Sequence, residues 1–223
     1  MSIIDSLNWR YATKKFDPNK QVSDQDIATL KEAIRLSPSS YGFQLYKVII
    51  VTDQKIKKEL MKHSYYQSQV RDCSHLFVFC SYKKVKPEHI DEFIALMEEA
   101  RESDKEETLK EKFESKAKIK AYSIIAKTDL GNRNPDDALD WMKKQCYIAL
   151  THLMVTAADM KIDTCPFEGF KSDAYDRILG LENRNLTSAV LCPVGYRAEN
   201  DGHQHRKKAV SYTHQTLPTN REV

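Results

Sequence analysis

One long segment of the chain carries large apolar side chains on nearly every side of the helix that it predicts. These residues lie between Ala138 and Met160, and they are Trp141, Met142, Cys146, Ile148, Leu150, Leu153, Met154 and Val155. A helix that is apolar all round is a buried helix. In a chain of 223 residues, this segment is predicted to be the core helix or one half of a subunit interface.

Helices and strands alternate in the first part of the chain. Ser23 followed by Asp26 is typical of an N-cap with an acidic first turn, and apolar residues then recur at helical spacing. Residues 48–52 and 75–82 are apolar runs of strand length, and Asp53 can cap the Lys-rich helix between them. This alternation predicts a layered core of the α+β or α/β class.

The remainder of the chain adds charged helices and one more core strand. Residues 83–127 are crowded with Lys and Glu and predict one or two solvated helices. A short helix is expected at 172–179 and the last core strand at 188–192. The sequence beyond Asn200 is polar and irregular.

The composition predicts one substantial core and excludes several kinds of partner. The chain is 41% hydrophobic and 30% charged, which is enough for a single domain. Its net charge of +3 is too small to indicate a nucleic-acid or membrane surface. The N-terminus lacks a signal-peptide pattern and there is no run of about eighteen apolar residues, so we expect a cytoplasmic protein.

Neither the cysteines nor the histidines predict a metal site. The five cysteines are odd in number and form no C-x-x-C pair, so we expect buried thiols instead of disulfides or a zinc site. His203 and His205 are interpreted as a solvent-facing pair. The chain also lacks a G-x-G-x-x-G motif and a P-loop, so a Rossmann-type nicotinamide domain is not predicted.

Three short segments carry candidate binding groups. Residues 37–46 end a helix with Ser, Pro and Gly, and a Ser-rich helix stop can hold an anion. Arg10 and Lys14 are four residues apart, so on a turn or short helix they face the same direction. Residues 166–170 place Glu and Gly in a turn after an apolar run. Taken alone, a helix stop, a solvated basic face and a simple turn are the simpler interpretations.

Taken together, the three segments resemble the bacterial FMN-dependent nitroreductase family, the oxygen-insensitive NAD(P)H type that also includes dihydropteridine reductases. The likeness runs from Ile3 to about Lys208, with further matches at 72–75, 140–145 and 193–196. It implies an α+β, nitroreductase-like fold, in which helices flank a mostly antiparallel central sheet. It also implies a homodimer with the long buried helix at its interface.

The same resemblance sets the expected domain organisation. A single nitroreductase-like domain would cover residues 1–208, with a helical excursion at about 84–130. Residues 209–223 would form an irregular C-terminal tail that is atypical of the family.

The resemblance implies an FMN site built from both ends of the chain and from both subunits. The residues that match the family's flavin-binding positions are Arg10, Tyr11, Ala12, Lys14, Pro38, Ser39, Ser40, Gly42, Tyr66, Gln69, Pro166, Glu168, Gly169 and Lys208. In the family, the loop that matches Ser39 and Ser40 reaches the flavin held mainly by the other subunit, so the site would be incomplete in a monomer.

Each group of matching residues has an implied role. Arg10, the two serines and Lys208 would secure the phosphate. Lys14 and Gln69 would lie near the pyrimidine edge and ribityl chain, where an ammonium favours the reduced flavin. In the family, a backbone N–H of the loop that matches Glu168–Gly169 points at flavin N5, and glycine permits a close backbone approach.

The implied activity is transfer of hydride from NADH or NADPH, through FMN, to a nitroaromatic, quinone or pterin-like acceptor by a ping-pong cycle. No side chain need act as acid or base, so no catalytic residue is predicted. Tyr122, Phe113 or Ile124 of the middle helices are candidates to cover the substrate slot. Two other functions stay open: a flavin-binding homologue with weak or no reductase activity that acts as sensor or scaffold, and an interaction protein that uses helices 87–127.

We predict that FMN binds more weakly than is usual for the family, because the chain departs from the family pattern. Tyr66 stands where an Asn is common, and Val210 stands where an Arg grips the phosphate. Losing one charge-assisted contact costs about 1.5 to 3 kcal/mol, which is roughly ten- to more than a hundredfold in affinity. Titration of FMN, followed by fluorescence quenching, measures this affinity, and nanomolar retention would contradict the prediction.

Overall fold

The computed structural model describes residues 2–102 and 109–204. Its helices are α1 (Ile3–Trp9), α2 (Asp24–Arg35), α3 (Gln54–Lys62), α4 (Gln69–Asp72), α5 (Pro87–Glu102), α6 (Leu109–Asn132), α7 (Pro135–Asp159) and α8 (Ser172–Ile178). Its strands are β1 (Tyr46–Val51), β2 (His75–Tyr82), β3 (Asp163–Thr164) and β4 (Leu186–Gly195).

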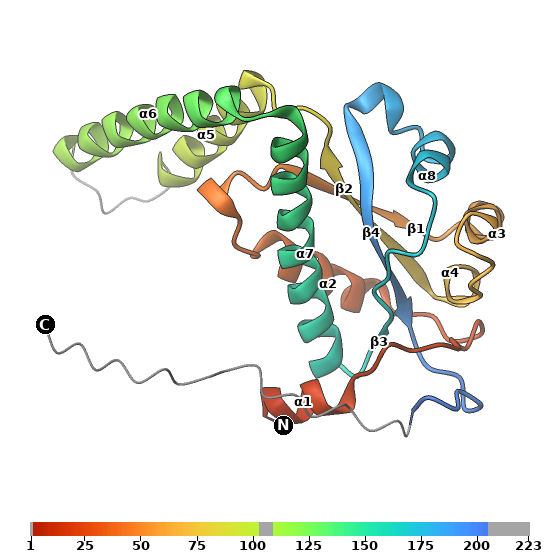
Figure 1. Cartoon of the computed structure of the whole chain (residues 1–223). Helices are drawn as coiled ribbons and strands as arrows, with labels where there is room; N and C mark the ends of the chain where they lie inside the picture. Colours follow the sequence, from red (N-terminus) through yellow and green to blue (C-terminus); the bar gives the residue numbers. More distant parts are fainter. Residues whose placement is uncertain (1, 103–108, 205–223) are drawn as a thin grey trace, which may run out of the picture.

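The strands form one sheet in the order β1-β2-β4-β3, and all neighbours in it are antiparallel. Helices cover both of its faces, with α2 and α7 on one side and α3, α4 and α8 on the other (Figure 1). The chain therefore has a three-layer α+β architecture, as the sequence predicts.

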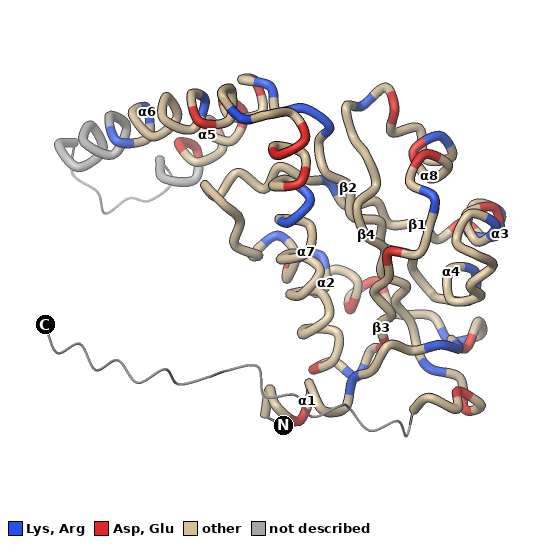
Figure 2. The backbone as a smooth tube through the Cα atoms, viewed as in Figure 1, with Lys and Arg blue, Asp and Glu red and all other residues tan. Residues whose placement is uncertain are grey.

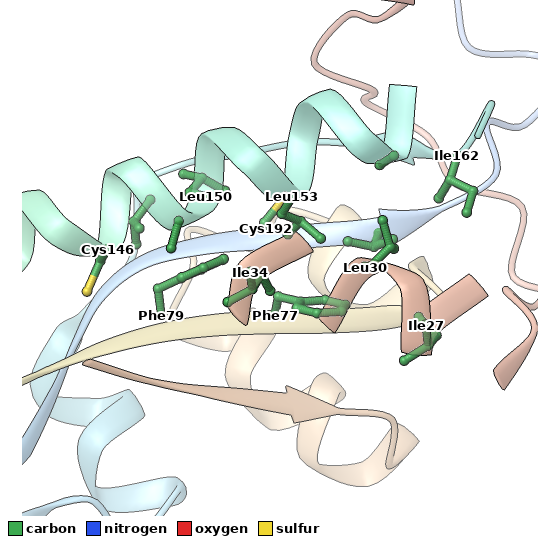
Figure 3. Close-up of a cluster of buried hydrophobic side chains, with 14 of the residues drawn as sticks. Ile27, Leu30, Ile34, Phe77, Phe79, Cys146, Leu150, Leu153, Ile162 and Cys192 are labelled. Atoms are coloured by element: carbon green, nitrogen blue, oxygen red, sulfur yellow. The ribbon is translucent and has the colours of Figure 1, made fainter. Parts of the chain in front are cut away.

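The sequence of strand β2 is a continuous apolar run because both faces of the strand are covered. Phe77 and Phe79 point into the cluster that includes α2 and α7 (Figure 3), whereas Leu76, Val78 and Cys80 point into the cluster on the opposite face. Alternate residues of a strand face opposite sides of a sheet, so a strand that is covered on both sides needs apolar residues throughout.

The two predicted helix caps are confirmed. The Ser23 side chain accepts a hydrogen bond from the Asp26 N–H at 3.1 Å and caps α2. The Asp53 side chain accepts bonds from the N–H groups of Lys55 and Ile56 and caps α3. Such caps satisfy backbone donors that have no partner within the helix.

Helix α7 is the predicted core helix, but within one protomer it is not buried on every side. Met142, Cys146 and Leu153 are fully buried against the sheet and the neighbouring helices. Tyr147 and Ile148, on the other side, are each 37% exposed. The core role is confirmed, and the role in a subunit interface stays a prediction.

Helices α5 and α6 form a hairpin that projects from the end of the sheet (Figure 1). Charges of both signs are interspersed along their described parts (Figure 2). The base of the hairpin is nevertheless packed, because Ile90, Ala126 and Leu130 share a cluster with Phe43 and Met142. The excursion is therefore only partly solvated.

Within that excursion, two of the candidate slot-covering residues can be compared. Tyr122 and Ile124 are 42% and 58% exposed, respectively. Phe113 lies outside the described side chains.

All five cysteines are free and buried, which confirms the expectation of buried thiols. Burial raises the pKa of Cys73 and of Cys146 to about 12. Among the described residues there is no cluster of three or more His, Cys, Asp or Glu side chains suited to a metal ion. In the same part of the chain, none of the helices has the length and apolar character needed to cross a membrane.

Truncation of Leu153 should destabilise the fold strongly, because this fully buried side chain packs α7 against the sheet. We expect Leu153→Ala to lower the free energy of unfolding by about 2 to 5 kcal/mol. Urea denaturation monitored by circular dichroism measures this loss. Lys144→Ala, at an exposed position of the same helix, is the control and should change stability by less than about 0.5 kcal/mol.

Candidate functional site

The segment that carries Arg10 and Lys14 is extended, so the prediction of a turn or short helix is wrong. Helix α1 ends at Trp9, and Arg10, its C-cap, has an extended backbone. Ala12 then forms a parallel bridge with Thr164, and the N–H of Thr13 donates to the Thr164 carbonyl at 3.3 Å. Alternate residues of an extended chain share one side. Arg10, Ala12 and Lys14 are therefore expected on the same side, for a reason other than helical spacing.

Both cations lie close to the buried thiol of Cys165. The Lys14 Nζ is 3.9 Å from its Sγ. Burial raises the pKa of Cys165, and the nearby charges of Lys14 and Arg10 oppose this rise. The structure thus brings Arg10 and Lys14 together beside the strand that precedes Pro166.

Arg10 has an unused donor. Its Nε is buried and makes no hydrogen bond within residues 2–102 and 109–204. Among the described residues, neither Arg10 nor Lys14 forms an ion pair with a carboxylate. Buried donors in native proteins nearly always have a partner. A pair of cations with an unsatisfied donor is suited to an anionic ligand.

The other side of the segment is held by two buried carboxylates that sequence analysis missed. Asp201 accepts hydrogen bonds from the Tyr11 hydroxyl at 3.0 Å and from the Lys14 N–H at 2.8 Å. Asp163 accepts a bond from the Thr13 hydroxyl at 3.2 Å. Burial alone would raise the pKa of Asp201, but backbone N–H donors, first that of His203 and then that of Lys14, lower it to about 2.

Arg197 completes this support. Its guanidinium forms a bidentate ion pair with Asp163, with a shortest distance of 2.6 Å. It also lies over the rings of Trp9 and Tyr11, at 4.2 and 4.6 Å from their centroids. Planar stacking and bidentate pairing are contacts that Arg makes well. The candidate anion site therefore rests on a rigid base.

A second group of predicted residues meets at the 166–169 loop. The Gln67 amide donates to the Gly169 carbonyl at 3.4 Å. A Cβ at Gly169 would lie 3.2 Å from the Gln67 Nε2 and 3.8 Å from the Tyr65 ring, so the close approach at this glycine is to these side chains. Within the described part of the chain, the N–H groups of Glu168 and Gly169 donate to no other residue.

The positions of Tyr66 and Gln69 differ. Tyr66 is 72% exposed and has a left-handed backbone with φ of 56°. Gln69 is the first residue of α4 and is only 6% exposed. The predicted flavin contacts of both residues remain predictions.

An open groove lies between α7 and the 166–168 segment. Its volume is about 430 Å³, and it is lined by Tyr147, Leu150, Thr151, Met154, Pro166, Phe167, Glu168 and Val190. The Tyr147 hydroxyl donates to the Glu168 carboxylate at its rim. This volume is within the range of small-molecule sites. Sequence analysis placed Tyr147 only in a helix, because nothing local links it to Glu168.

The third predicted segment does not join the others within one protomer. Ser40 donates its N–H to the Gln145 side chain at 2.8 Å, and the Ser39 hydroxyl accepts a bond from the Gln44 N–H at 2.9 Å. This loop is therefore attached to the middle of α7, whereas α1 meets the C-terminal end of α7 (Figure 1). Pro38 and Gly42 in the same loop are exposed, and Gly42 has a φ of +75°.

One predicted phosphate ligand cannot be placed. Lys208 lies outside the described residues, as does Val210. The described chain ends three residues beyond Asp201.

Comparison with known proteins identifies the family. Residues 7–196 match the model of the Nitroreductase family. The chain is 34% identical over 205 residues to a Staphylococcus haemolyticus protein named "Putative NAD(P)H nitroreductase". The aligned region covers 89% of each of the two chains. The chain therefore belongs to the nitroreductase family, as the resemblance of its motifs predicts.

Solved structures agree on the fold. A protein of Exiguobacterium sibiricum, described as a putative nitroreductase in complex with FMN, superposes with a TM-score of 0.76 at 18% identity over 99% of this chain and 95% of that one. A Staphylococcus epidermidis protein, described as a putative NAD(P)H:FMN oxidoreductase, has the same TM-score and identity over 97% and 96% of the two chains. The nitroreductase-like fold is thereby confirmed.

The low pKa of Asp201 predicts a contribution to stability that is lost in acid. Its folded pKa of about 2 is below the ordinary value of 3.8, so the contribution is fully present above the ordinary value and is lost as the pH falls towards 2. We expect the stability difference between the wild type and Asp201→Asn to shrink by about 1 kcal/mol between pH 6 and pH 3. Urea unfolding at both pH values measures it, and a difference that does not change with pH would refute this prediction.

Proposed function

We propose that the protein is an FMN-dependent oxidoreductase that passes hydride from NADH or NADPH to a small electron acceptor, of the nitroaromatic, quinone or pterin-like class, by a ping-pong cycle. Membership of the nitroreductase family and the FMN complex of a structural relative support this proposal. The observation that carries it is the pair of Arg10 and Lys14, two cations without a carboxylate partner in the described chain, one of which keeps a buried unused donor.

The phosphate of FMN is an anion, so it would be a negatively charged partner for Arg10 and Lys14. Arg10 would hold the phosphate through its guanidinium, because a planar fork of N–H donors matches phosphate oxygens. Lys14, on the same side of the extended segment, would lie toward the ribityl chain and the pyrimidine edge. Lys208, outside the described residues, would add a further charge from the C-terminus.

The 166–169 loop would hold the ring system. Its two unused N–H groups can donate to an acceptor such as flavin N5, and Pro166 and Phe167 give the adjoining groove an apolar wall. When bound, FMN supplies reversible hydride acceptance. The protein's own part is to bind and orient it and to keep one face open for donor and acceptor in turn.

A homodimer would complete the site. Ser39 and Ser40 are attached to α7 and do not contact Arg10 in their own protomer. Their hydroxyls would reach the flavin of a second copy if α7 packs at the interface. The exposed faces of Tyr147 and Ile148 supply apolar surface for that packing.

Absorbance tests the proposal directly. We expect the purified protein, after incubation with FMN and gel filtration, to be yellow and to bleach on anaerobic addition of NADPH or NADH. Arg10→Gln should weaken FMN binding roughly ten- to a hundredfold, as expected for loss of one charge-assisted contact. Lys15→Gln is the matched control, because it removes a neighbouring charge from an exposed residue on the opposite side of the segment.

Three outcomes separate the alternatives. A yellow protein that does not bleach supports a flavin-binding homologue that acts as sensor or scaffold. A colourless protein that cannot be reconstituted supports a role in interaction only. Equal effects of Arg10→Gln and Lys15→Gln would contradict the assignment of Arg10 to the phosphate.

A further inference from the structure

We propose that Asp201 is a positioning residue for the cationic side of the flavin site: it holds the 11–15 segment from behind so that Arg10 presents its charge to the phosphate and Lys14 presents its charge to the ribityl chain and pyrimidine edge. This inference rests on the proposed function and adds to it a residue that does not itself touch the ligand. Asp201 is fully buried, so it acts through the backbone and side chains that it holds.

The contacts of Asp201 converge on that segment. One carboxylate oxygen accepts hydrogen bonds from the Tyr11 hydroxyl at 3.0 Å, the Lys14 N–H at 2.8 Å and the Lys15 N–H at 3.2 Å. The other oxygen accepts a bond from the His203 N–H at 3.0 Å and lies 3.2 Å from Nδ1 of the same residue's ring. Every donor is an N–H or O–H group, so the position requires two acceptor oxygens.

Side chains alternate between the two sides of the extended 11–15 segment, so hydrogen bonds on one side affect the side chains on the other. Tyr11 and Thr13 are bound on one side, by Asp201 and Asp163, respectively. Ala12 and Lys14 project to the other side, with the Lys14 Nζ near Cys165. Fixing the Lys14 backbone N–H therefore fixes the direction in which its side chain leaves the backbone.

The two cations would otherwise repel each other, because no carboxylate of the described chain pairs with either one. When no anion is present, repulsion between two like charges on one side of a segment favours conformations in which the charges are farther apart. The hydrogen bonds to Asp201 offset that tendency, and they hold the segment in the geometry that it needs with the ligand bound. Such preorganisation increases affinity without a direct contact.

The substitution Asp201→Asn tests this role while keeping the size of the side chain. An amide is uncharged and has one acceptor oxygen: if that oxygen stays on the 11–15 segment, the NH2 group faces the His203 N–H, and the bonds to the segment lose the carboxylate charge that strengthens them. The measurement is the ratio of the dissociation constants of riboflavin and FMN, because only FMN carries the phosphate. We expect Asp201→Asn to weaken FMN binding about tenfold or more and to weaken riboflavin binding less, because riboflavin lacks the phosphate that Arg10 would bind, so that the ratio falls.

Asp176→Asn is the matched control. Asp176 is also buried and its carboxylate accepts bonds from the N–H and hydroxyl of Ser188, but it lies on α8 and does not contact the cationic segment. It should lower thermal stability and leave the riboflavin-to-FMN ratio unchanged. Equal weakening of both ligands by Asp201→Asn would show a merely structural role and would overturn the proposal, as would an unchanged FMN affinity.

Tyr11→Phe keeps the test open if Asp201→Asn does not fold. It removes one bond to the ionised Asp201 carboxylate and leaves those from the Lys14 and Lys15 N–H groups, so it should lower the ratio in the same direction by about threefold, less than Asp201→Asn. The wild type separates the two hypotheses. If it binds FMN no better than riboflavin, the proposal for Asp201 fails while flavin binding stands; if it binds neither, the proposed function fails and the proposal fails with it.

Discussion

The antiparallel pairing of β2 with β4 is the contact on which the rest of the structure depends. The pairing runs from His75 opposite Val194 to Tyr82 opposite Leu186, and both faces of the two strands are covered by apolar side chains from helices. Because α7 packs on one face while α3, α4 and α8 pack on the other, the two strands set the positions of these helices. The candidate segments follow other elements of this frame: residues 10–15 follow α1, residues 37–46 follow α2, and residues 166–169 follow β3.

The cationic segment of the candidate site is attached to the sheet only at its edge. Its cations come from an extended segment that adds only a single bridge beside β3, and a bridge of that size is weak on its own. Two buried carboxylates, Asp163 and Asp201, and the stacked Arg197 hold the segment in place of the longer hydrogen-bonded ladder that a full strand would have. Charge on the ligand side is thus balanced by opposite charge behind the backbone.

Local features of the fold could be predicted from the sequence, and long-range ones could not. The caps at Ser23 and Asp53 depend on residues two or three positions away, so their pattern is visible in the chain. The last strand is longer than the predicted 188–192, because its ends are set by pairing with β2.

The site shows the same division. Helical spacing predicts that Arg10 and Lys14 face the same direction, but the segment is extended. The two side chains are still expected on one side, because alternate residues of an extended chain share a side. Asp201 and Tyr147 find their partners 190 and 21 residues away, beyond the reach of any local motif. In one protomer about 21 Å of α7, at 1.5 Å per residue, separates Gln145, which holds the serine loop, from Asp159, which holds α1. If both groups bind one cofactor, as the proposed function requires, the second group would come from a neighbouring subunit. Cofactor occupancy and subunit assembly would then rise and fall together on dilution.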